Sequence, residues 1–345
     1  MTSYPEQIES EHALDEVLTR PDPKLVEFIR TVSSPLVLLG AGGKMGPTLA
    51  VLARRAAVAA GCKLDIVAVS RFGDPSVRRW LESYEIQILP CDLMRRESLQ
   101  QLPEAENMIY LVGLKFGTSQ NPSATWAANT LIPANICDRY PHCRIVALSS
   151  GSIYPLVRVA SGGALESEPL TPLGEYANAC VERERIFEYY SQNNGTPLAL
   201  LRLFYAVELR YGILVDLAAK VLAGQPIDLT MGYFNWIWQG DANALILRSL
   251  ALVHTPPAAY NLTHPQIQSV RTVAEKFGEL LGRPVALTGS EAGSALLGNP
   301  ARLCMALGAP AMPLETVMRW IAGWLLRKGR LLGKPTHFEV RDGRY

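Results

Sequence analysis

The stretch from Pro35 to Ala50, PLVLLGAGGKMGPTLA, limits the possible folds of this chain more than any other. An apolar run is followed by Gly40, Gly43 and Gly46, after which apolar residues resume at helical spacing. We interpret this as a strand, a tight loop and a helix. Glycines at this spacing let the backbone turn, approach a pyrophosphate and pack the helix closely, and the helix N-terminus offers free N–H groups. The pattern predicts a dinucleotide-binding loop, and a glycine-rich turn without a ligand is the alternative.

Apolar strand-like segments and helical segments alternate downstream of this loop, as far as residue 204. This alternation predicts an α/β fold built on a Rossmann-type, doubly wound parallel sheet. Beyond residue 204 the pattern changes to helices separated by short extended pieces. We therefore expect a helical N-terminal extension (1–34), a nucleotide-binding Rossmann domain (35–204) and a smaller, mostly helical substrate domain (205–345). Some strands of the substrate domain are expected to return to the Rossmann sheet.

Composition narrows the classes of protein that fit. The 345 residues are 48% hydrophobic, and the formal net charge of +1 gives no electrostatic case for binding nucleic acid. The polar, acidic N-terminus does not resemble a secretion signal, and no run approaches roughly 20 apolar residues, so we expect a cytoplasmic protein without a membrane partner. Six cysteines are scattered without a C-x-x-C pair, and no metal site is expected.

The residues after the second predicted strand bear on the choice of nucleotide. An acidic residue there would bind the ribose hydroxyls of NAD, but the strand ends in Ser70 and Arg71. An arginine can accept a 2'-phosphate through charge-assisted hydrogen bonds, so NADP is preferred, with NAD as the second option. Lys44, beside Met45 in the glycine loop, adds positive charge, or is a solvated side chain. Asp92, followed by Leu93, is placed near the adenine, or caps its own loop.

Two further motifs lie downstream: Leu148-Ser149-Ser150-Gly151-Ser152-Ile153-Tyr154, and Gly174-Glu175-Tyr176 before a helix. With these motifs in order behind the glycine loop, the chain resembles the extended short-chain dehydrogenase/reductase family, which includes NAD-dependent epimerases and dehydratases such as UDP-galactose 4-epimerase. The resemblance implies a catalytic serine at Ser150 and a catalytic tyrosine at Tyr176. It also implies cofactor contacts at positions that match the family pattern: Val112, Gly113, Lys115, Asn129 and Phe204. Family members often pair through the helices near 124–137 and 176–191, which implies a homodimer.

The chain departs from the family pattern one helical turn after Tyr176, where Cys180 replaces the family's lysine. In the family that lysine lowers the pKa of the tyrosine and holds the nicotinamide ribose. A phenol with a pKa of about 10 is almost entirely neutral at pH 7. Three explanations stay open: Lys115 supplies the charge, the oxidised nicotinamide itself depresses the tyrosine pKa, or the protein binds nucleotide without turnover.

A second departure concerns the substrate. Positions that hold the diphosphate in nucleotide-sugar enzymes of this family correspond here to Tyr205 and Phe234. This favours a smaller polyol ring, stacked on Trp236 or Trp238, although core packing of both tryptophans is the alternative. Arg210 or Arg271 would suit an anionic group, which keeps a sugar acid open.

The sequence therefore predicts an NAD(P)-dependent oxidoreductase or epimerase. Its predicted substrate is a sugar, sugar acid or similar polyol, and not a nucleotide-diphosphate sugar. The alternative is a catalytically silent NAD(P)-binding protein that acts as a redox sensor or scaffold.

Overall fold

A computed structural model describes residues 4–115, 120–334 and 336–343 of the chain. Its centre is a seven-stranded, all-parallel sheet with strand order β12-β7-β5-β4-β1-β2-β3. These strands are β1 (Leu36–Leu39), β2 (Ile66–Ser70), β3 (Gln87–Pro90), β4 (Asn107–Tyr110), β5 (Arg144–Ser150), β7 (Leu198–Leu203) and β12 (Ala258–Leu262). Every residue of β1 and β4 is buried, because helices cover both faces of the sheet and leave no polar side to alternate with. The predicted Rossmann-type parallel sheet is confirmed.

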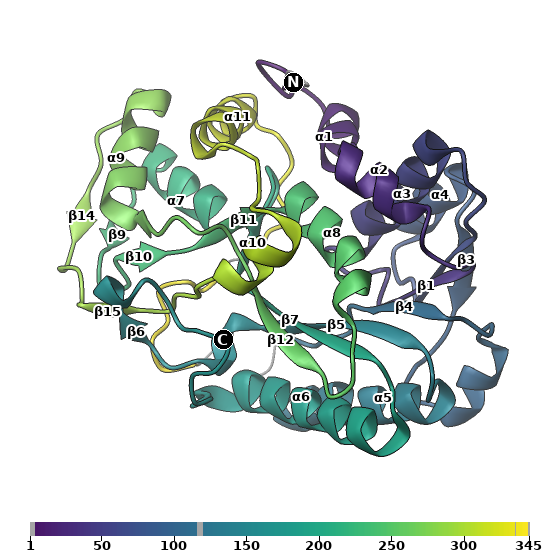
Figure 1. Cartoon of the computed structure of the whole chain (residues 1–345). Helices are drawn as coiled ribbons and strands as arrows, with labels where there is room; N and C mark the ends of the chain where they lie inside the picture. Colours follow the sequence, from purple (N-terminus) through teal and green to yellow (C-terminus); the bar gives the residue numbers. More distant parts are fainter. Residues whose placement is uncertain (1–3, 116–119, 335, 344–345) are drawn as a thin grey trace.

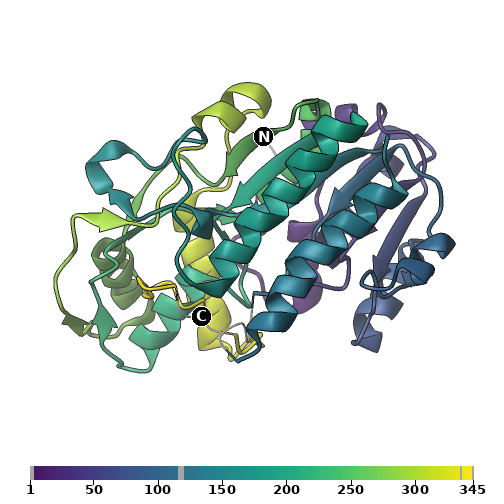
Figure 2. The same cartoon turned by 90° about the horizontal axis from the view of Figure 1, so that it is seen from below.

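One face of the sheet is covered by α5 (Pro122–Arg139) and α6 (Gly174–Asn194), which lie side by side below the sheet (Figures 1 and 2). The other face is covered by α2 (Pro23–Ile29), α3 (Gly46–Ala60) and α8 (Gln239–Arg248). The N-terminal region thus packs against the sheet layer through α2. It also contains a helix that the sequence pattern did not predict, α1 (Glu11–Leu18), which contributes to the core of the C-terminal part.

The C-terminal part is built on helices α7 (Ile213–Leu222), α9 (Val270–Leu281) and α11 (Leu314–Leu326), whose apolar faces share one core (Figure 1). The remaining helices are α4 (Pro75–Ser83) and α10 (Ala301–Leu307). The short strands are β6 (Val157–Arg158), β8 (Tyr205–Val207), β9 (Ile227–Asp228), β10 (Tyr233–Phe234), β11 (Trp236–Trp238), β13 (Gln268–Ser269), β14 (Leu287–Thr288) and β15 (Ser294–Ala295). Edge strand β12 comes from this part of the chain and pairs with β7.

The strand order reverses at β1, which lies between β2 and β4. The chain leaves β1 towards one half of the sheet and returns to β4 on the other side, so the loops after these strands diverge and leave a crevice. In open parallel sheets ligands bind in such a crevice at the carboxyl ends of the strands. The predicted glycine loop follows β1 and lies at this point.

Candidate active site

The loop after β1 has a backbone that only glycine fits at two positions. Gly40 has a φ of +80°, and a Cβ there would lie 3.1 Å from the backbone of Leu111 and Val112. A Cβ on Gly46 would lie 2.5 Å from the backbone of Ala41, closer than real contacts allow. The loop therefore turns sharply, and the first turn of α3 packs directly against it.

The first turn of α3 has no side-chain cap, since Met45 occupies the cap position and its side chain has no oxygen. Unpaired N–H groups at a helix start form a favourable site for phosphate. This turn and the glycine loop line a groove of about 910 Å³. The residues present thus fit the pyrophosphate of a dinucleotide, with Gly40, Gly43, Lys44, Met45 and Gly46 all along the groove.

Ser70 and Arg71 lie at the end of β2, beside the glycine loop. The Ser70 hydroxyl is so near that a Cβ on Gly42 would lie 2.7 Å from it, and Arg71 is exposed. Asp74 lines the groove at this end and accepts a hydrogen bond from the backbone N–H of Ser76 at 2.8 Å, which caps α4. A basic residue, Arg71, and an acidic residue, Asp74, therefore both lie on the segment between β2 and α4, and Asp74 is the one that lines the groove.

Three residues predicted to contact the cofactor have protein partners of their own. The Asp92 carboxylate accepts from the backbone N–H of Met94 at 3.1 Å, and the Leu93 carbonyl accepts from Asn135 at 3.2 Å. Asn129 is fully buried, and its amide oxygen accepts from Arg183 at 2.9 Å. None of the three is among the described residues that line the groove or the cavity next to it, so their role at the cofactor stays a prediction.

Ser150 and Tyr176 come together in a cavity of about 210 Å³ that adjoins the groove. Ser150 is the last residue of β5, and Tyr176 is in the first turn of α6, so the sheet and the covering helix position one residue each. The Tyr176 hydroxyl interacts with the side chains of Ser150 and Cys180. Ser150 Oγ also accepts from the backbone N–H of Ser152 at 3.2 Å, which fixes its orientation.

The surroundings of Tyr176 keep its phenol neutral. Burial raises its pKa well above the ordinary value, and Cys180 raises it further, while Arg183 and Ser150 lower it. Cys180 is itself fully buried, and burial raises the pKa of its thiol, so a thiolate is disfavoured. In this state Tyr176 is a proton donor, and accepting a proton requires a nearby positive charge.

Three cationic side chains line the cavity, and no carboxylate of the described residues does: Lys44, Lys115 and Arg183. Lys44 Nζ donates to the carbonyl of Ala206 at 2.7 Å and lies 3.8 Å from the centre of the Tyr211 ring. Burial lowers the pKa of Lys44 to about 7 and also lowers that of Lys115. The cavity is therefore suited to an anion, which would favour the charged forms of both amines.

Aromatic and C-terminal residues complete the walls of the cavity. Phe204 lies between Gly151 and Gly298, where added Cβ atoms would meet its ring at 2.5 and 2.3 Å, so the site requires both glycines. Thr336 donates to Asp216 Oδ2 from its backbone N–H at 2.8 Å and from its hydroxyl at 2.6 Å. No sequence pattern indicated that Thr336 or Arg183 lies in the site, although Arg183 lies seven residues after Tyr176 and so on the same helical face.

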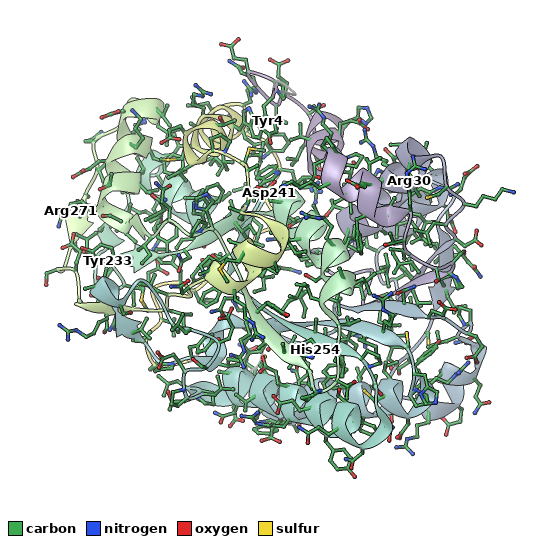
Figure 3. The ribbon with its side chains drawn as sticks, viewed as in Figure 1. Tyr4, Arg30, Tyr233, Asp241, His254 and Arg271 are labelled. Carbon is green, nitrogen blue, oxygen red and sulfur yellow. The ribbon has the colours of Figure 1, made fainter. Side chains whose placement is uncertain are left out.

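The tryptophans considered for stacking and the arginines considered for an anionic substrate do not line the cavity, although Arg210 lines the groove. Trp236 and Trp238 are 1% and 2% exposed and belong to the core of the C-terminal part, so the core alternative holds for both. Arg210 pairs with Glu11, Asp15 and Glu208, and Arg271 pairs with Glu291 on the outer side of α9 (Figure 3). Of the aromatic positions, Tyr205 lines the cavity, whereas Phe234 is buried in the core.

The described residues contain neither a membrane-spanning helix nor a metal-binding group of side chains. No helix among them has both the length and the apolar character needed to cross a bilayer. No group of three histidine, cysteine or acidic side chains in the described ranges is arranged to hold a metal ion.

A parallel sheet with a glycine loop at its switch point and an adjoining serine–tyrosine pair defines an enzyme of the short-chain dehydrogenase type, which uses a nicotinamide cofactor. The family model described as "NAD dependent epimerase/dehydratase family" matches residues 36–256, and the chain belongs to this family. A comparison with curated proteins gave no match.

Solved structures with a similar fold include three that contain NAD. UDP-glucuronic acid 4-epimerase from Bacillus cereus is 14% identical, with a TM-score of 0.70, over 85% of this chain and 99% of that chain. UDP-glucose 4-epimerase from Thermus thermophilus is 18% identical, with a TM-score of 0.65, over 84% and 98%. The dTDP-glucose 4,6-dehydratase from Streptomyces venezuelae is 15% identical, with a TM-score of 0.68, over 85% and 97%. At these identities the likeness concerns the fold.

Proposed function

We propose that the chain is an NADP-preferring oxidoreductase or epimerase that acts on a sugar acid or a similar small polyol, and not on a nucleotide-diphosphate sugar. The observation that carries the proposal is the pairing of Ser150 and Tyr176 in the cavity that adjoins the glycine-loop groove. A substrate carbon in this cavity would lie next to both hydroxyls and to the nicotinamide end of the groove. The same arrangement serves a dehydrogenase and an epimerase, because they differ in the face to which hydride returns.

The proposed reaction oxidises an alcohol of the substrate to a carbonyl by removing one proton and one hydride. Ser150 donates a hydrogen bond to the substrate oxygen, and the ionised Tyr176 takes the proton of the substrate hydroxyl. A nicotinamide cofactor held by the glycine loop would supply the oxidation as the acceptor of hydride from the carbon that bears this hydroxyl, so that the alcohol would become a carbonyl. In the reverse direction Tyr176 returns its proton to the carbonyl oxygen.

The preference for an acid rests on the charges of the cavity. Lys44, Lys115 and Arg183 face it without an acidic residue among the described lining side chains. Ser149 Oγ is a buried polar atom of a lining residue without a hydrogen-bond partner among the described residues, and a polar ligand would satisfy it. The volume of about 210 Å³ is below the ~300–1,000 Å³ of drug-sized ligand sites, which supports a compact substrate.

A substrate panel tests the proposal. Purified protein is incubated with NADP or NAD and matched pairs of neutral sugars and their acids, together with nucleotide sugars. Reduced cofactor is followed by absorbance, and epimerised products by chromatography. We expect turnover of acids above their neutral partners, and turnover of nucleotide sugars alone would contradict the proposed substrate class.

A catalytically silent NAD(P)-binding protein is the second candidate function. The buried Cys180 in place of lysine, and the raised pKa of Tyr176, are the observations that favour it. Tight cofactor binding without turnover of any compound in the panel, and without an epimerised product, would support it.

Replacing Arg71 by alanine is expected to raise the Kd for NADP about tenfold and to leave the Kd for NAD unchanged. A charge-assisted hydrogen bond contributes about 1.5–3 kcal/mol, and only NADP has the 2'-phosphate that Arg71 would bind. Titration calorimetry with both cofactors measures this effect. The control is Arg78→Ala, because Arg78 is an exposed arginine on α4 that pairs with Glu82. Equal losses for NADP and NAD would contradict the preference and favour ribose binding by Asp74.

We further propose a homodimer that pairs through α5 and α6. Leu131 on α5 and Tyr189 on α6 are large apolar side chains that are 53% and 62% exposed on these helices. Sedimentation velocity distinguishes the dimer from a monomer.

A further inference from the structure

Arg183 is buried beside the catalytic tyrosine without a carboxylate partner among the described residues. It is 3% exposed and lies on the face of α6 that carries Tyr176 and Cys180. Its Nη1 donates to the carbonyl of Val112 at 3.0 Å and to Asn129 Oδ1 at 2.9 Å, and its Nη2 donates to Cys180 Sγ at 3.4 Å. All three acceptors are uncharged in this site, so the positive charge is not cancelled by an ion pair.

The site is shaped to hold this guanidinium. A Cβ on Gly113, at the end of β4, would lie 2.8 Å from Arg183 Nη1, so glycine makes room for it. A lysine in place of Cys180 would extend into the space of Nη2, which is 3.4 Å from the Sγ atom. The small side chain at position 180 therefore leaves the space that the Arg183 guanidinium occupies.

The charge of Arg183 acts on Tyr176. It lowers the pKa of the phenol, against the effect of burial. Arg183 also lowers the pKa of Cys180, which Tyr176 contacts. Tyr110 and Glu184 are further groups near the guanidinium, and both raise its pKa, so Arg183 stays charged.

We propose that Arg183 is a positioning residue whose fixed positive charge stabilises the anion of Tyr176 during proton transfer, in place of the lysine missing at position 180. Asn129 orients Arg183 in this arrangement. The expected change in kcat rests on the proposed function. The expected effect of Arg183 on the ionisation of Tyr176 does not, because it can be measured in the cofactor complex without substrate.

The first test measures Tyr176 directly in the complex with NADP. Protein labelled with carbon-13 at the tyrosine ring is titrated by NMR, and the Tyr176 signal is identified as the one lost in Tyr176→Phe. In Arg183→Gln we expect the pKa of Tyr176 to rise by about one to three units, as for removal of a neighbouring opposite charge, so that the ionised signal seen at the alkaline end of the native titration is weakened or lost. Arg183→Lys should restore most of the native titration. An unchanged titration in Arg183→Gln would overturn the proposal.

Kinetics with a substrate from the panel give the second test. In Arg183→Gln the acid limb of the pH profile of kcat should move to higher pH by the same interval, and kcat should recover at alkaline pH. The KM for the substrate should change less than kcat. The double variant Cys180→Lys/Arg183→Gln should return the limb towards its native position. A loss of kcat that is equal at all pH values would indicate a merely structural role and overturn the proposal.

Two controls separate the possible failures. Arg185→Gln, two residues further along α6 and paired with Glu188, should leave both profiles unchanged. If Arg183→Gln does not fold, Gly113→Ala makes the same test, since the added methyl group displaces the guanidinium without removing it. A shifted Tyr176 titration without turnover of any panel compound would refute the proposed function and leave the role of Arg183 standing.

Discussion

Replacing Tyr176 by phenylalanine is expected to lower kcat about 10³-fold while the Kd for the cofactor stays within about twofold. The hydroxyl is the group that exchanges a proton with the substrate oxygen, and general acid–base catalysis contributes about 10²–10⁴-fold. The ring remains and continues to fill the buried space between β5 and α6. Steady-state kinetics with the best compound of the panel, and cofactor titration, measure the two effects.

The matched control for this variant is Tyr189→Phe. Tyr189 lies on the same helix and is 62% exposed, so its hydroxyl should contribute nothing to turnover. A Tyr176→Phe variant with native kcat would show that the proton moves through another group of the cavity, and Lys44 would be the next candidate because its pKa is lowered to about 7.

Replacing Glu184 by alanine is expected to destabilise the fold by about 3–5 kcal/mol. Its carboxylate accepts from Arg202 at 3.1 and 2.8 Å, and both side chains are almost completely buried, at 1% and 5% exposure. Removal of one partner leaves a buried charge without its counterion. Arg202 is on β7 and Glu184 is next to Arg183 on α6, so the ion pair also ties the helix of the catalytic tyrosine to the sheet. Chemical denaturation measures the free energy of unfolding.

Two further variants make this second experiment specific. Glu188→Ala removes the partner of the exposed Arg185, and surface pairs contribute about 0–1 kcal/mol, so its midpoint should barely move. The double variant Glu184→Leu/Arg202→Met should recover much of the lost stability, because an apolar pair leaves no buried charge. A loss of less than about 1 kcal/mol in Glu184→Ala would contradict the structural role of the pair.

Local patterns were sufficient for the elements that carry the fold. The apolar run at 36–39 is β1, and the run from Arg144 to Ser150 is β5, whose interior is apolar because helices cover both faces of the sheet. Gly61 is the C-cap of α3 with a φ of 64°, a conformation that glycine adopts readily and that ends many helices. Helix α1 was not predicted, since its short, partly acidic segment is stabilised by packing against the distant core of the C-terminal part.

The substrate side was harder to predict because its walls come from distant segments. The run FNWIWQGD suggested aromatic rings for stacking, yet Trp236 and Trp238 point into the core, and composition alone does not give the direction of a side chain. Thr336 enters the cavity from a C-terminal segment that has no periodicity, held there by Asp216 on α7.

The sequence by itself determined the sheet, the glycine loop at its switch point, and the positions of Ser150 and Tyr176, because backbone turns and strand burial depend on neighbouring residues. It also showed that the family's lysine is a cysteine at position 180. Only the tertiary structure decided which charge lies beside the tyrosine. Arg183 is two turns from Tyr176 along α6, and its guanidinium is held there by the end of β4 and by Asn129 on α5, contacts that no local pattern encodes.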